Sequence, residues 1–110
     1  MSSSIPDWPS DADGDVFRRL AASGFDFSRD WSVDYNVDFE NWPPTDCALK
    51  LLEFEFGALS LFPPDESGIG YVQFQILGPV TYEHVTSTQQ RVTDAMRPFG
   101  GVCESWGVLH

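Results

Sequence analysis

The sequence predicts an α+β domain, a ferredoxin-like βαββαβ antiparallel sheet with one additional N-terminal helix. Residues 31–40 alternate large apolar with polar or acidic side chains, as an antiparallel strand does when one face is buried and the other solvated. Two further strand-like runs, 58–62 and 71–77, enclose a loop rich in Pro and Gly, which indicates a hairpin. Helical patterns between the strands complete the order α-β-α-β-β-α-β, and without its first helix this order is the split βαββαβ unit.

We expect a flexible leader over residues 1–10 and a single domain over residues 11–110, because about 100 to 150 residues is the common domain size. The first helix has apolar residues at helical spacing. They are Val16, Phe17, Leu20 and Ala21. Asp13 or Asp15 is expected to cap this helix, and Gly24 to end it, since glycine readily takes the backbone conformation that follows a helix.

The strand over residues 31–40 has two distinct faces. Its apolar face comprises Trp31, Val33, Tyr35, Val37 and Phe39. Its other face comprises Ser32, Asp34, Asn36, Asp38 and Glu40. Because strand side chains alternate, the first set is predicted to be core and the second a solvated acidic row.

The remaining elements have clear start and stop signals. Thr45 is expected to cap a second helix that fades between Phe54 and Gly57, and Thr81 to cap a third helix. A last strand is expected over residues 102–106. The hairpin strand over 71–77 adds three residues to the predicted core. They are Val72, Phe74 and Ile76.

Charge narrows the function classes. Seventeen acidic against six basic residues give a formal net charge of −11. Such a chain is a poor match for a phosphate backbone, where Lys and Arg must displace counterions, so no direct nucleic-acid binding is expected. Two interpretations of the acidity stay open, a solubilising surface and a surface matched to a basic partner.

The chain shows no pattern typical of a catalytic, metal or cofactor site. His84 lacks a second ligand at metal-binding spacing, and no carboxylate pair has one member in an apolar setting. Cys47 and Cys103 are predicted to be buried apolar thiols. The first residues do not resemble a secretory signal, and no apolar run approaches the ~20 residues of a membrane span. We expect a cytoplasmic, non-enzymatic protein without cofactors.

Three segments resemble the family called regulator of ribonuclease activity B. They are Asp13–Leu20 (DGDVFRRL), Gly24–Ser28 (GFDFS) and Gly100–Gly107 (GGVCESWG). The similarity extends from Asp11 to the end of the chain. The resemblance implies a small acidic α+β protein that binds ribonuclease E, particularly its C-terminal scaffold region, and reduces RNA cleavage without catalysing a reaction.

The candidate partner-binding residues are the acidic row and one aromatic residue. They are Asp34, Asn36, Asp38, Glu40 and Trp106. For Trp106 two interpretations compete, a side chain that seals the sheet against a helix and a hot spot for a partner. The leading hypothesis is a regulator that binds a protein with a basic surface, and the resemblance implies that this protein is ribonuclease E. The alternatives are a small-ligand-binding or enzymatic ferredoxin-like domain and a weak dimer that stacks its open sheet faces.

Overall fold

The computed structural model describes residues 8–66 and 68–108. Its elements, in chain order, are α1 (Ala12–Ala22), β1 (Asp30–Phe39), α2 (Asp46–Phe56), β2 (Ser60–Phe62), β3 (Tyr71–Pro79), α3 (Tyr82–Met96), a short 3-10 helix η1 (Arg97–Phe99) and β4 (Gly101–Val108). The α+β class and the predicted order of elements are confirmed. Among the described helices, none is long and apolar enough to cross a membrane.

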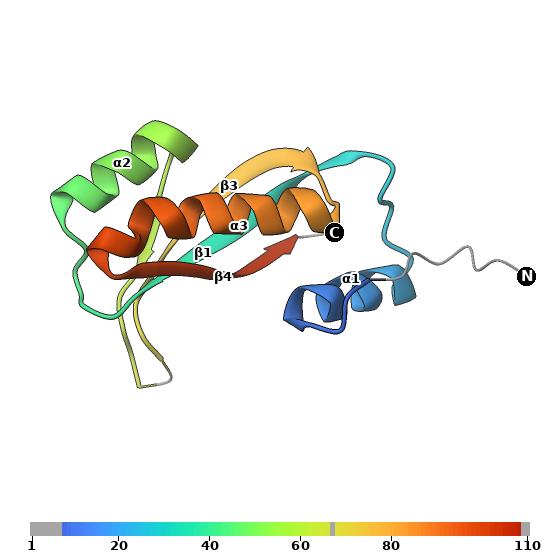
Figure 1. Ribbon diagram of the computed structural model, residues 1–110, viewed down its shortest axis with the longest axis horizontal. Helices are drawn as coiled ribbons and strands as arrows, with labels where there is room; N and C mark the ends of the chain where they lie inside the picture. Colours follow the sequence, from blue (N-terminus) through green and yellow to red (C-terminus); the bar gives the residue numbers. More distant parts are fainter. Residues whose placement is uncertain (1–7, 67, 109–110) are drawn as a thin grey trace, which may run out of the picture.

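The four strands form one antiparallel sheet in the order β2-β3-β1-β4, so β1 and β3 are its central strands. Helices α2 and α3 pack on one face of this sheet, and α1 lies beside the end of β4 (Figure 1), where it also contacts α3. The opposite face carries the polar side chains of β1. The finer ferredoxin-like assignment stays a prediction.

The alternation in β1 has the predicted consequence for burial. The side chains that are fully buried on the helix-covered face include Val33, Tyr35, Val37, Phe39, Val72 and Phe74. Ile76 is partly buried and packs against this core. Phe74 stacks on Phe56 of α2 with ring centroids 4.6 Å apart, which links the sheet to its helical cover.

Trp31 departs from the prediction that it belongs to the core. Its side chain is half-buried at the edge of the core, where its ring packs against Phe25 at 4.7 Å. The guanidinium of Arg29 lies 4.1 Å from the ring centroid, and the indole N–H donates to the carbonyl of Asp26. The loop before β1 therefore covers Trp31, so alternation along the strand alone could not decide its burial.

The helix starts follow from side-chain caps. Thr45 and Thr81 accept backbone N–H groups at the starts of α2 and α3, as predicted. The cap of α1 is Asp11, whose Oδ1 accepts the Gly14 N–H at 2.7 Å, so the prediction of a cap at Asp13 or Asp15 was wrong. With Asp11 as the cap, the helix starts earlier and Asp13 and Asp15 lie in its first turn. There their negative charges interact favourably with the positive end of the helix dipole.

The two cysteines lie in different surroundings. Cys103 is buried in β4, as predicted, and burial raises the pKa of its thiol to about 12. Cys47 is exposed near the start of α2, so the prediction that it is buried was wrong. The buried residues of α2 are Ala48 and Leu52, and Cys47 falls on the outer side of the helix.

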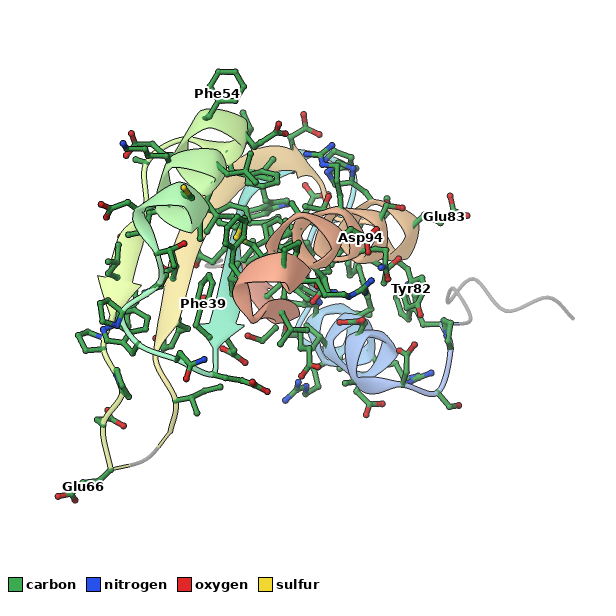
Figure 2. The ribbon with its side chains drawn as sticks, turned by 60° about the vertical axis from the view of Figure 1, so that its left-hand side comes forward. Phe39, Phe54, Glu66, Tyr82, Glu83 and Asp94 are labelled. Atoms are coloured by element: carbon green, nitrogen blue, oxygen red, sulfur yellow. The ribbon has the colours of Figure 1, made fainter. Side chains whose placement is uncertain are left out.

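Helix α1 is attached to the rest of the fold through aromatic rings. Phe17 is fully buried, and its ring lies 5.1 Å from that of Trp106 and 6.1 Å from that of Tyr82. Tyr82 lies between α3 and α1 (Figure 2). Trp8 stacks on the same Phe17 at 5.5 Å. The first seven residues of the predicted leader lie outside the described residues.

Candidate functional site

The open face of the sheet carries a ladder of hydrogen-bonded polar side chains. Strand register sets Asp34 opposite Gln75 and Asn36 opposite Gln73. Gln75 Nε2 donates to Asp34 Oδ1 at 2.6 Å, and Gln73 Nε2 donates to Asn36 Oδ1 at 2.9 Å. Asn36 Nδ2 in turn donates to Ser105 Oγ at 3.1 Å. The ladder crosses the three neighbouring strands β3, β1 and β4 and orients the side chains of Asp34 and Asn36 in the acidic row.

Basic residues are excluded from this sheet. The four described strands contain the carboxylates of Asp30, Asp34, Asp38 and Glu104 and no Lys or Arg. The six basic residues of the chain lie on helices or connections. They are Arg18, Arg19, Arg29, Lys50, Arg91 and Arg97. The carboxylates of the open face therefore have no cationic neighbour within the described strands. Their charges add up to a negative electrostatic potential in front of this face.

Asp38 is a partly desolvated member of the row. Register sets it between Tyr71 of β3 and Val102 of β4, and its side chain is half-buried, as are those of Asp34 and Asn36. Burial raises the pKa of Asp38 above its usual value, and the negative charge of Glu104 raises it further. The partly desolvated charge of Asp38 would interact more strongly with a docked cation than a fully hydrated one.

The structure brings four of the five candidate residues to one region. Asp34, Asn36 and Asp38 lie on the open face, and exposed Glu40 directly follows β1. Trp106 is separate from them. It pairs with Tyr35, lies on the covered face and is only 8% exposed. Its indole N–H donates to Asp13 Oδ1 at 2.9 Å, which favours the interpretation that Trp106 seals the sheet.

The sequence analysis missed an aromatic pair beside the acidic row. Phe62 of β2 and Tyr71 of β3 stack with ring centroids 4.7 Å apart and face the same side as Asp38, because Tyr71 pairs with both. The available signal was two aromatic residues enclosing the predicted loop over residues 63–70. Glu104 was also missed; it lies in β4 at the register shift between Asn36 and Val37, and its charge acts on Asp38.

A groove lies between α1, α3 and β4. This groove has a volume of about 560 Å³, and its polar lining includes Asp13, Gln89 and Thr93. Asp13 Oδ1 also accepts Gln89 Nε2 at 3.2 Å, while the Thr93 hydroxyl accepts the Cys103 N–H. These contacts connect three elements of the fold. Within residues 8–66 and 68–108, no group of three or more His, Cys, Asp or Glu side chains is arranged to hold a metal ion.

Comparison with protein families gives a match over most of the chain. A protein family described as Regulator of ribonuclease activity B (RraB) has a model that matches residues 10–108, which is nearly the whole chain. The match contains all the described helices and strands, and with them the polar ladder and the aromatic pair. A search of curated proteins finds no match to this chain.

Proposed function

The chain belongs to the regulator of ribonuclease activity B family, and from this premise we propose that it regulates a ribonuclease by binding a basic segment of it without catalysing a reaction. The family name itself gives regulation of ribonuclease activity. The proposed partner is ribonuclease E, which the resemblance of the opening and closing segments of the sequence implies. The proposal puts the encounter in the cytoplasm and takes the predicted domain, residues 11–110, as the binding unit.

One observation carries the electrostatic part of the proposal, namely that the described strands hold four carboxylates and no Lys or Arg. A face of one charge sign attracts an oppositely charged partner from a distance and raises the association rate. The same face repels a phosphate backbone, so a basic protein segment suits it better than RNA does.

The polar ladder prepares the face for binding. Asp34 and Asn36 already have hydrogen-bonded neighbours on β3, which limits the rotamers that their side chains adopt. Ordering a side chain on binding costs about 0.5 to 1.5 kcal/mol, so side chains that are oriented beforehand lose less on association. A carboxylate held in this way can accept a bidentate hydrogen bond from an Arg side chain.

A pair of charge reversals on the open face tests the proposal. The double variant Asp34→Lys, Glu40→Lys leaves Asp38, whose pKa is raised by burial, untouched. Its matched control is Glu53→Lys, Glu55→Lys, which makes the same change in net charge at two exposed positions of α2, on the covered side of the sheet. Surface plasmon resonance against the C-terminal scaffold region of ribonuclease E measures association at two salt concentrations.

We expect the sheet variant to associate on the order of tenfold more slowly than the control at low salt, because steering depends on local charge. The difference should shrink at higher salt, where charges more than ~8 Å apart are screened. RNA cleavage by ribonuclease E, measured in parallel, should be inhibited by the control and much less by the sheet variant. Equal association of the two variants, or no association of the unaltered protein, would remove the proposal.

A further inference from the structure

The hairpin between β2 and β3 exposes apolar side chains together. Five large apolar side chains are exposed among the described residues, and four of them belong to β2, β3 or the loop between them. Phe62 (39%) and Ile69 (56%) come together at the loop end. Leu61 (46%) pairs with the buried Val72 and so lies on the other face of β2. The loop extends beyond the sheet, with Glu66 near its tip (Figure 2). Single exposed apolar residues are ordinary, but exposed apolar residues gathered at one place mark a contact site.

Phe62 and Ile69 border a groove of about 530 Å³, here called the hairpin groove. It is lined by Phe62, Pro63, Asp65, Gly68, Ile69 and Tyr71. A groove of this volume accommodates one large side chain of a partner. Its walls are apolar and aromatic, and Asp65 supplies a carboxylate at its rim.

Local contacts hold the hairpin groove in shape. The rings of Phe62 and Tyr71 stack with an interplanar angle of 14°. Backbone hydrogen bonds of 3.2 and 3.4 Å join Asp65 and Gly68 in both directions. The Trp42 ring packs against Gly70 so closely that a Cβ added there would lie 2.4 Å from it. Because the groove is already formed before binding, little free energy is spent on ordering its residues when a partner binds.

The hairpin groove continues into the acidic face. Strand register aligns Phe62 with Tyr71, and Tyr71 with Asp38, in one row across the sheet. Neighbours in such a row have Cβ atoms about 4.5 to 5.5 Å apart. The Phe39 N–H donates to the carbonyl of Gly70, which brings the end of β1 against the loop. An apolar surface and an acidic surface thus meet at Asp38.

We propose that the hairpin groove binds one apolar side chain of the partner segment, while Lys or Arg residues beside that side chain contact the surrounding carboxylates. This inference rests on the proposed function. Charge complementarity identifies the occupant, since residues 60–79 contain Asp65 and Glu66 and no Lys or Arg. A second copy of this chain fits poorly, because it would bring another net charge of −11 to the same place.

The two surfaces have different roles in binding. Charges on the open face act at a distance and set mainly the association rate, while the buried apolar contact sets mainly the dissociation rate. Removal of the groove therefore changes the affinity without changing its dependence on salt. This difference separates the inference from the proposed function.

Two synthetic peptides test the inference, Arg-Arg-Phe-Arg-Arg and Arg-Arg-Ser-Arg-Arg, with binding measured by fluorescence anisotropy. Both carry the same charge, so only the groove distinguishes them. We expect the unaltered protein to bind the Phe peptide about tenfold more tightly than the Ser peptide. In Phe62→Ala, Ile69→Ala the preference should fall to about twofold or less, whereas Asp34→Lys, Glu40→Lys should weaken both peptides equally.

Phe54→Ala is the matched control, because Phe54 is 87% exposed on α2 and lies far from the Glu66 loop (Figure 2). It should keep the full preference for the Phe peptide. Ile69→Ser serves as a second variant that alters one exposed loop residue and leaves the strands unchanged, and it should reduce the preference.

Salt-dependent but equal binding of both peptides would overturn the groove inference and leave the proposed function standing. A preference that persists in both groove variants would also overturn it. If sedimentation shows a dimer of the unaltered protein that the groove variants abolish, the groove is a contact between copies, and the inference is wrong.

Discussion

Trp106 and Asp13, 93 residues apart in the sequence, meet through a hydrogen bond of 2.9 Å from the indole N–H to a carboxylate oxygen. The bond connects β4 to the first turn of α1, and the Trp106 ring packs on Phe17 of the same helix. The same oxygen of Asp13 accepts a second hydrogen bond, from the side-chain amide of Gln89 on α3. A single carboxylate thus joins the N-terminal helix to both the sheet and its covering helix.

Replacement of Asp13 by Ala should destabilise the fold by about 1 to 3 kcal/mol, because the partly buried N–H groups of Trp106 and Gln89 lose their acceptor. Asp15→Ala is the matched control in the same helical turn. Its exposed ion pair with Arg18 is worth about 1 kcal/mol or less. Urea denaturation measures both variants, and equal losses would contradict a special role for Asp13.

Phe74→Ala should cost roughly 3 to 5 kcal/mol of unfolding free energy, since the ring is buried between Tyr35 and Phe56 and its removal leaves a cavity. Gln75→Ala, at the next position on the open face, should cost less than ~1 kcal/mol. Denaturant midpoints compare the two. Similar losses would mean that both faces of the sheet are covered.

Asp38→Asn should raise stability at neutral pH. Burial raises the native pKa of Asp38 above its ordinary 3.8, so the native state loses stability as pH rises from that value through the raised pKa. The amide does not ionise and avoids this loss. Denaturation series between pH 3 and pH 8 measure the unfolding free energy of both proteins. The stability of the variant relative to the unaltered protein should increase with pH, and a difference that is constant over this range would refute the explanation.

Cys47 should react with iodoacetamide in the native protein while Cys103 does not. Cys47 is exposed, whereas Cys103 is buried and its pKa is raised to about 12, so almost none of it is thiolate at neutral pH. Mass spectrometry of peptides locates the label. In Cys47→Ser, labelling should require unfolding by urea, and rapid native labelling of Cys103 would contradict the packing of β4.

Local patterns in the sequence predicted much of the fold. Alternation over residues 31–40 separated Tyr35 and Val37 from Asp34 and Asp38, because opposite faces of a strand follow from chain geometry. Thr45 and Thr81 revealed two helix starts, since a cap acts on a backbone N–H only three residues away. The acidic row of the candidate site could also be predicted from the alternation along the strand.

Only the tertiary structure decided which distant side chains meet. The cap at Asp11 leaves Asp13 to bind Trp106, and the register of three strands aligns Phe62 and Tyr71 with Asp38. The cover of Trp31 by Phe25 and the exposure of Cys47 likewise depend on how whole elements pack. Sequence periodicity reports forces between residues near in the chain, whereas register and helix packing minimise the free energy of the whole chain and bring together residues that no local pattern relates.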